Sequence, residues 1–400
     1  MPTVLTGTLG VGDVLANKQV RDVSKGLYYK YQTLNPITAL LMKMPKGRTA
    51  YNPKVEWSRQ DHLPRWDTIS GVTTPSGATV VVTPANVSYF KVGDLVQIPQ
   101  LSPAATETDI GVVTAKSTTI TLTAVGWQSN LAATAATFPT VTIGMNLHIL
   151  TDSSEEYSQK PAMKVLKVEQ EWNHVHFVRA PYVVGNIEMD VKQYTGPERP
   201  ARRLETYKDI RIQVEENMIH GERYYRDGSD GRQFFARGFR RFIQQGGGDN
   251  VFDWSSGFTE ADFDSFLLKG PMKQGIGSQV RFGFFASNIC LELTKIGKAK
   301  QRLVDGGTTI LGMAFETYKG PNGLKLHFMD HHLMVNDWEN AGLIIDPTRA
   351  RVRPYGSQGV MRLLTDIQEN DRAGVADEWQ IIYSLEVDRF EPHGWMDKAA

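Results

Sequence analysis

The histidines of segment 326–337 are the first residues in this sequence whose type and spacing could support chemistry. The segment reads LHFMDHHLMVND, and it holds three of the nine histidines of the chain within six residues. A zinc-dependent hydrolase needs three such side chains to converge on one ion, with further groups to orient them. The candidate ligands are therefore His327, His331 and His332, with Asp330 between them.

The spacing of these residues does not suit a metal site. If 324–329 form a strand, His327 and His331 share its outer face but lie roughly 13 Å apart. His331 and His332 would point to opposite faces, and the HExxH spacing by which a helix joins two histidines is absent. We therefore interpret the segment as a strand whose polar residues face water, and a metal-dependent hydrolase is the alternative.

Other patterns that could support catalysis are incomplete. The glycine-rich stretch 275–280 has valine where a dinucleotide-binding loop needs its third glycine. Gly297 and Lys298 lack the upstream glycine of a phosphate-binding loop, and no GxSxG motif occurs. The single cysteine, Cys290, lies in an apolar run and is interpreted as structural. We predict no catalytic residue, no cofactor and no metal ligand.

Composition narrows the class of protein further. The chain has 400 residues, 44 basic and 44 acidic side chains and no net charge, which argues against a dedicated nucleic-acid binder and permits association between copies. One cysteine excludes an internal disulfide and fits a reducing cytoplasm. Neither a signal peptide nor a run of ~18 apolar residues is present, so we expect a soluble product with no membrane contact.

Local patterns predict an α+β chain with a β-rich insertion. Residues 1–50 are too poor in apolar side chains to fold alone and are expected to form an arm. A strand is predicted at 54–61. Short β-branched runs separated by Gly, Pro, Asn and Asp fill 71–150, which is typical of a small all-β domain. The longest helical pattern runs over 205–226 and is expected to stop at the glycines of 228–231.

The second half mixes helices and strands. Thr259 and Asp262 form a capping box at the start of a helix, and another helix is expected from 287 or 288 to 303. Residues 315–318 and 324–328 read as a hairpin joined by a Gly-rich turn. Alternating apolar residues predict a closing strand over 379–387.

Three arginine clusters are the candidate contact residues. One precedes the predicted long helix, one follows it and one alternates along a strand face. These arginines could simply be solvated surface residues or form local ion pairs. Two functional interpretations are also open: they could contact other subunits, or they could form a sparse positive lining that faces nucleic acid. The zero net charge favours ion pairs between copies. The clusters are Arg199, Arg202 and Arg203; Arg237, Arg240 and Arg241; and Arg349, Arg351 and Arg353.

Several strings occur in a characteristic order along about residues 50–390. They are VEWSRQD at 55–61 before Leu63-Pro64, VGDLV at 92–96, GVVT at 111–114, TTITLT at 118–123, the helix 205–221 ending in HGE, RGFRRFI at 237–243 and IYSLEV at 382–387. This ordered set resembles the tailed-bacteriophage major capsid proteins of the Hong Kong 97 type.

The resemblance implies an α+β Hong Kong 97-type capsid fold with a long spine helix and an inserted small β domain. The segment 228–258 departs from the family pattern, which leaves the start of the axial domain open. The implied parts are an N-terminal arm, 1–50; an extended loop region, 51–190, with the β insertion at about 71–150; a peripheral domain, 191–254; an axial domain, 255–360; and a return to the peripheral domain, 361–400.

The resemblance also implies a function without an active site. The chain would be a major capsid protein that self-assembles as pentamers and hexamers into an icosahedral virion shell around a double-stranded DNA genome. Assembly would take place in the host cytoplasm with scaffolding, portal and decoration proteins as further partners, and the DNA contacts would be non-specific. The alternatives left open are the hydrolase, an accessory phage protein that binds through the β insertion, and an encapsulin-like compartment.

Overall fold

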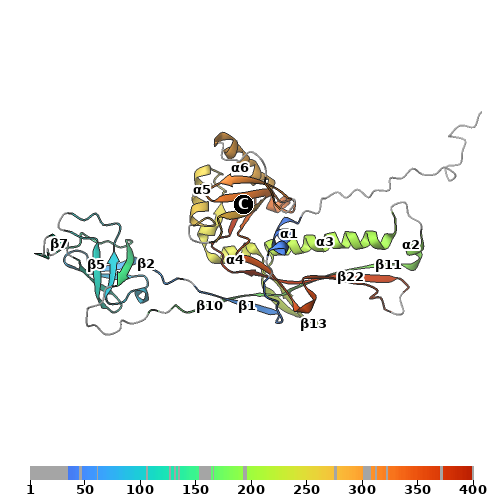
Figure 1. The fold of residues 1–400 in the computed structure, drawn as a ribbon, viewed down its shortest axis with the longest axis horizontal. Helices are drawn as coiled ribbons and strands as arrows, with labels where there is room; N and C mark the ends of the chain where they lie inside the picture. Colours follow the sequence, from blue (N-terminus) through green and yellow to red (C-terminus); the bar gives the residue numbers. More distant parts are fainter. Residues whose placement is uncertain are drawn as a thin grey trace, which may run out of the picture. The chain divides into compact units, whose positions relative to one another are not determined.

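The computed structural model divides the chain into two units, one formed by Met1–Trp57 with Gln170–Ala400 and the other by Ser58–Glu169 (Figure 1). A two-stranded ladder of β1 (Lys54–Arg59) and β10 (Glu169–His174) carries the chain between them. The structure describes residues 35–44, 47–60, 62–104, 107–125, 128–129, 132–133, 136–152, 164, 166–191, 196–273, 277–300, 308–310, 313–320, 323–369 and 373–398.

The second unit is a closed antiparallel β-barrel, built from the β-branched runs that the sequence marks. Its strands follow the order β2-β3-β6-β5-β4-β9, and the ladder between β9 and β2 closes it. Alternate residues point into one apolar core that includes Ile69, Val82 and Phe138. The strands are β2 (Trp66–Thr74), β3 (Thr79–Pro84), β4 (Asp94–Gln97), β5 (Ile110–Lys116), β6 (Ile120–Ala124) and β9 (Asn146–Asp152), with the short pair β7 (Gln128–Ser129) and β8 (Ala132–Ala133) beside them.

In the first unit a long helix lies on a four-stranded sheet. Helix α3 (Glu198–His220) buries Ile210, Val214 and Met218 against the central strand β22 (Val375–Val387) and its neighbour β11 (His176–Val184). The expected closing strand is confirmed. The other sheet strands, β20 (Ala350–Pro354) and β21 (Met361–Leu364), both pair with β22, and the short helices α1 (Pro36–Lys43) and α2 (Asn186–Asp190) contact α3.

A mixed seven-stranded sheet forms the rest of this unit, and helices α5 and α6 lie on one of its faces (Figure 1). Thr259 is confirmed as the N-cap of α5, because its hydroxyl accepts a hydrogen bond from the amide of Asp262 at 3.3 Å. The Asp262 carboxylate accepts a bond from this hydroxyl at 2.6 Å. Burial beside α5 raises the pKa of the Cys290 thiol to about 12. In sheet order the strands are β14 (Val251–Asp253), β23 (Gly394–Asp397), β19 (Gly342–Ile345), β15 (Val280–Phe285), β18 (Lys325–Asp330), β17 (Met313–Lys319) and β16 (Thr308–Ile310), and the helices are α5 (Glu260–Lys269) and α6 (Ser287–Lys300).

The predicted limits of the long helix are wrong at both ends. Helix α3 begins at Glu198, so the first arginine cluster lies inside it, and it ends at His220 rather than Arg226. A Cβ on Gly221 would lie 2.5 Å from the carbonyl oxygens of Asn217 and Ala236, so the returning chain requires glycine where the helix stops. The next residues form a hairpin of β12 (Tyr224–Gly228) and β13 (Gly231–Phe235), followed by α4 (Phe239–Gly246).

Sheet membership does not follow the predicted domain limits. Strand β20 lies in the range expected for the axial domain but pairs with β22 in the four-stranded sheet. Strand β23 lies in the range expected to return to the peripheral domain but joins the seven-stranded sheet. The end of the second predicted helix, 301–303, and the glycine-rich stretch 274–276 fall outside the described residues. Among the described helices, none combines the length and the apolar character needed to cross a membrane.

Candidate functional site

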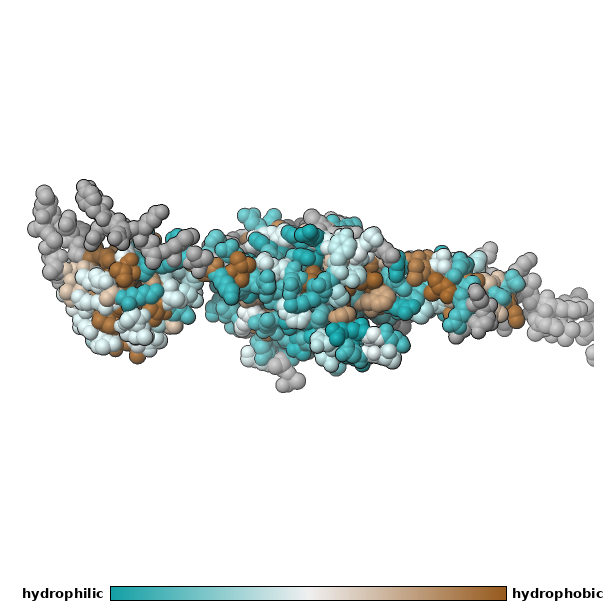
Figure 2. All heavy atoms as spheres, turned by 90° about the horizontal axis from the view of Figure 1, so that it is seen from below, coloured by the Kyte–Doolittle hydropathy of each residue, from teal (hydrophilic) through white to brown (hydrophobic). Residues whose placement is uncertain are grey.

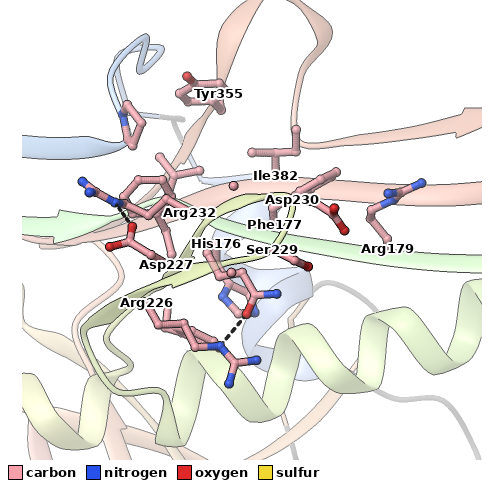
Figure 3. Close-up of a pocket in the computed structure, with 17 residues that line it drawn as sticks. His176, Phe177, Arg179, Arg226, Asp227, Ser229, Asp230, Arg232, Tyr355 and Ile382 are labelled. Atoms are coloured by element: carbon pink, nitrogen blue, oxygen red, sulfur yellow. Dashed lines mark hydrogen bonds and ion pairs between the residues drawn. The ribbon is translucent and has the colours of Figure 1, made fainter.

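A groove of about 980 Å³ lies on the first unit between the β12–β13 hairpin and the sheet strand β11 (Figure 3). The sheet side contributes Phe177 and Ile382. Their neighbours Val178, Ile381 and Tyr383 belong to the core on which α3 packs. Arg179 from β11 and Arg226 and Arg232 from the hairpin add guanidinium groups beside this apolar surface. The groove therefore combines aromatic and cationic surface, the composition of a site that binds another polypeptide.

The polar side chains in the groove are not arranged for acid–base chemistry. Asp227 accepts a hydrogen bond from Nε of Arg232 at 2.7 Å, so its carboxylate is engaged within the hairpin. The His176 ring packs against Phe235 and Tyr383 at centroid distances of 6.2 and 5.8 Å. Burial lowers the pKa of His176, which keeps the ring neutral and apolar in character. These residues shape a surface and do not form a catalytic dyad.

The histidines that opened the sequence analysis serve the core of the first unit. The predicted strand is confirmed as β18, which contains His327 but ends before His331 and His332. The prediction that these residues face water is wrong, because His327 and His331 are buried. His327 Nδ1 lies 2.8 Å from the hydroxyl of Thr317 on β17, which satisfies it locally. The His332 ring stacks on His331 at 5.7 Å. Within the described residues, no three His, Cys, Asp or Glu side chains form a metal-binding group.

The partner of His331 is a buried carboxylate that sequence reasoning missed. Glu215 of α3 is fully buried and lies 3.1 Å from His331 Nε2. The same carboxylate accepts hydrogen bonds from the amides of Ile37 and Thr38 at 2.8 and 2.7 Å, and from the Thr38 hydroxyl. These amides belong to the first turn of α1, where backbone N–H groups have no acceptor within their own helix. Glu215 thus caps α1 from another helix and joins three separate segments.

The first arginine cluster forms an ion-pair network within the chain. Arg199 and Arg203 both bind the buried carboxylate of Asp377 on β22, with Arg199 Nη2 at 2.6 Å and Arg203 Nη2 at 3.1 Å. Tyr182 is a third side chain that donates to this carboxylate, at 2.6 Å. The Arg199 guanidinium in particular holds the pKa of Asp377 far below its usual range. Arg202 points outward and pairs with two glutamates of its own helix.

The second cluster surrounds the start of α4. Arg241 pairs with Glu222 at 2.6 Å on the surface. Arg240 lies over the Trp338 ring at 4.5 Å, and burial lowers its pKa. Arg237 is half-buried, and burial lowers its pKa in the same way. Two members of this cluster therefore pack in the fold through their planar faces.

The third cluster lies along β20. Arg349 pairs with Asp388 at 2.8 Å, and Arg353 pairs with Glu386 across the ladder to β22. Arg351 between them is exposed, and it has no ion pair within the described part of the chain. Most of the nine arginines thus have acidic partners in their own chain, as the interpretation by local ion pairs expects.

An exposed apolar patch at one end of the first unit, named here the end patch, was also missed from the sequence. It lies where β11, α2 and the start of α3 meet (Figure 1), and apolar residues interrupt the polar surface toward this end (Figure 2). Ile187 is 85% exposed and Val191 54% exposed. The sequence signal is the alternation of apolar residues at 187, 189 and 191. The patch comprises Ile187, Met189 and Val191, which follow one another along α2 and its C-terminal end.

A family model described as the SU10 major capsid protein matches residues 5–399 of this sequence. The chain belongs to the SU10 major capsid protein family. None of the curated proteins compared matches the sequence. Similar solved structures include chains from Mycobacterium phage Cain (9% identity, 98% of this chain and 99% of that chain, TM-score 0.50), Mycobacterium phage Adephagia (9%, 98% and 99%, 0.48) and the SrpI encapsulin of Synechococcus elongatus PCC 7942 (9%, 58% and 76%, 0.41).

Membership in the SU10 major capsid protein family decides between the functions that the sequence left open. The Hong Kong 97-type capsid resemblance and the α+β fold class are confirmed. The chain is a structural component of a phage virion shell and not a hydrolase.

Proposed function

We propose that this major capsid protein assembles as pentamers and hexamers into an icosahedral shell around a double-stranded DNA phage genome. The family match carries the proposal, and the end patch supports it, because a chain that exposes the apolar side chains of Ile187, Met189 and Val191 gains free energy when a second copy covers them. The zero net charge supports it, since copies do not repel one another strongly. Shells of this kind need surfaces that are self-complementary in more than one symmetry environment.

We further propose roles for the parts of the chain. Helix α3 with the four-stranded sheet forms the peripheral domain, and the seven-stranded sheet with α5 and α6 forms the axial domain at the centre of each ring. The segment 51–190 is the extended loop that carries the barrel. The exposed Arg351 and the three guanidinium groups of the groove are the arginines best placed for neighbouring subunits or packaged DNA.

Scaffolding, portal and decoration proteins are the further partners proposed, with assembly in the host cytoplasm and no membrane step. The single cysteine fits assembly in a reducing compartment. Contacts with DNA would be electrostatic, so they would be non-specific and weakened by salt. They would also be weak, because the chain has no net basic charge.

The test is negative-stain electron microscopy of the purified full chain, with metal analysis on the same fraction. We expect five- and six-fold rings or closed particles without stoichiometric metal. The variant Ile187→Asp/Val191→Asp should lose the rings and keep the thermal midpoint of the monomer, since both side chains are exposed. The matched control is Val92→Asp, an exposed apolar residue of the barrel. A discrete dimer or tetramer, or one metal ion per chain, would overturn the proposal.

A further inference from the structure

One tryptophan of the barrel, Trp66, is largely exposed to solvent. Trp66 opens β2 and is 63% exposed. Among the described residues it packs against no other ring and no cation. Each of the other described tryptophans contacts a ring of the first unit: Trp57, Trp172, Trp254, Trp338, Trp379 and Trp395. An exposed indole without an internal role is a candidate for contact with a ligand.

The strand register surrounds Trp66 with neutral polar side chains. Trp66 lies opposite His148 on β9, and His148 in turn lies opposite Gln97 on β4. One step along the same ladder, Thr68 lies opposite Asn146. Opposed residues share a face, and their sequence neighbours point into the barrel core, so these five side chains face outward together. We call them the Trp66 row.

Hydrogen bonds hold this row in place. The Thr68 hydroxyl donates to the side-chain oxygen of Asn146 at 3.2 Å, and Gln97 Nε2 donates to Asp109 at 2.7 Å. These bonds use only one end of each side-chain amide. The NH₂ group of Asn146 and the carbonyl oxygen of Gln97 are the other ends, and they can bind a ligand. The outward surface therefore presents fixed donors and acceptors beside a flat aromatic ring.

We propose that the Trp66 row binds a neutral oligosaccharide. A pyranose has an apolar face of C–H groups, which packs on an indole, and a rim of hydroxyls, which both donate to and accept from amide, imidazole and hydroxyl groups. Three neighbouring strands span about 10 Å, enough for about two sugar rings. The row contains no lysine, arginine, aspartate or glutamate, so it lacks the side chains that usually bind a charged polymer.

The composition favours a sugar over a second copy of the chain. The core of a protein–protein contact gathers several apolar side chains, whereas Trp66 is the one large apolar member of this row. The end patch, which we assign to contact between copies, has only apolar members and lies on the first unit. The two surfaces are thus chemically distinct, and the oligosaccharide proposal stands apart from the pentamers and hexamers proposed above.

The experiment is saturation-transfer difference NMR of the full chain with maltohexaose, cellohexaose and chitohexaose, followed by calorimetric titration of any binder. We expect saturable binding of at least one of these oligomers, and an affinity at least tenfold lower in Trp66→Ala and in Asn146→Ala. The matched control Val92→Ala, also exposed and apolar on the barrel, should bind like the unaltered chain. Circular dichroism checks that each variant retains the barrel.

Three results would overturn the proposal. The first is that none of the three oligomers gives a saturable signal. The second is that Trp66→Ala or Asn146→Ala binds as tightly as Val92→Ala. The third is that the chain binds no sugar while Trp66→Ala abolishes the assembled rings, which would make the row a contact between copies. A failure to form rings alongside intact sugar binding would instead contradict only the assembly proposal.

Discussion

The carboxylate of Glu215 is expected to hold the short helix α1 on the spine helix α3. It accepts two amide hydrogen bonds and one hydroxyl bond from the first turn of α1, and it lies beside His331. Neither side-chain polar atom of the buried Asn35, the residue before α1, has a partner in the described part of the chain. The negative charge of Glu215 also favours the positive end of the α1 dipole. Few other contacts can satisfy those amides.

The cost of removing this carboxylate follows from the contacts. Hydrogen bonds to a charged acceptor contribute about 1.5–3 kcal/mol each, and breaking a buried pair on one side costs about 3–5 kcal/mol. We therefore expect Glu215→Ala to lower the free energy of unfolding by about 3–5 kcal/mol. Glu215→Gln keeps the shape but aims an NH₂ group at amide or hydroxyl donors, so we expect roughly half of that loss.

The assay combines urea unfolding of the unassembled chain with hydrogen exchange read by mass spectrometry. In Glu215→Ala, the amides of 37–43 should exchange about 100-fold to 1000-fold faster, the factor that corresponds to about 3–4 kcal/mol of lost protection. The amides of α5 should change less. The matched control is Glu216→Ala on the exposed side of the same helix. Equal stability and equal α1 protection in the two variants would refute the capping role of Glu215.

Three further outcomes are expected. Lowering the pH from 7 to 5 should cost about 2–4 kcal/mol of stability, read from urea unfolding at each pH. Burial lowers the pKa of His220 to about 4 and of His393 to about 3, so the unfolded chain takes up the protons first as the pH falls through about 6.5. A flat profile would contradict this. Asp377→Asn should lose about 2–3 kcal/mol, because two arginines of α3 lose their buried acceptor, whereas Asp366→Asn on the exposed side of the same network should lose under about 1 kcal/mol. Thr259→Ala should lower the thermal midpoint by the equivalent of about 1 kcal/mol through the lost cap of α5, and an unchanged midpoint would contradict the capping role.

Elements whose signals are local were predictable from the sequence. The capping box at Thr259 needs residues only three apart, and the hairpin of β17 and β18 needs two apolar runs with a turn between them. The barrel strands follow from β-branched runs and turn residues in the same way. The predicted end of the long helix is wrong because Gly221 fits the apolar periodicity of the helix. The helix stops there because the chain packs back against Gly221 at Ala236, which is distant in sequence.

The surroundings of the candidate residues were not predictable, because their partners lie far away in sequence. His331 reads as a polar strand residue until Glu215, 116 positions earlier, is placed beside it. Arg199 reads as surface charge until Asp377, 178 positions later, is found under it. Burial by a distant segment decides whether a polar residue faces water or serves the core. The end patch was missed because apolar residues are expected to be buried, and the sequence alone does not show where tertiary structure leaves them exposed.

The buried polar contacts of the first unit gather where distant segments meet, and this placement indicates what they do. Glu215 joins α1, α3 and the end of β18, while Asp377 joins β22 to α3, and Arg281 pairs with Asp346 between β15 and the chain after β19. A buried ion pair adds little net stability compared with apolar residues of the same volume, yet it is costly to break on one side. We infer that its effect is to penalise a wrong alignment of the segments more than to strengthen the right one. The surfaces proposed to contact neighbouring copies are correctly placed only when the elements that carry them are aligned in this way.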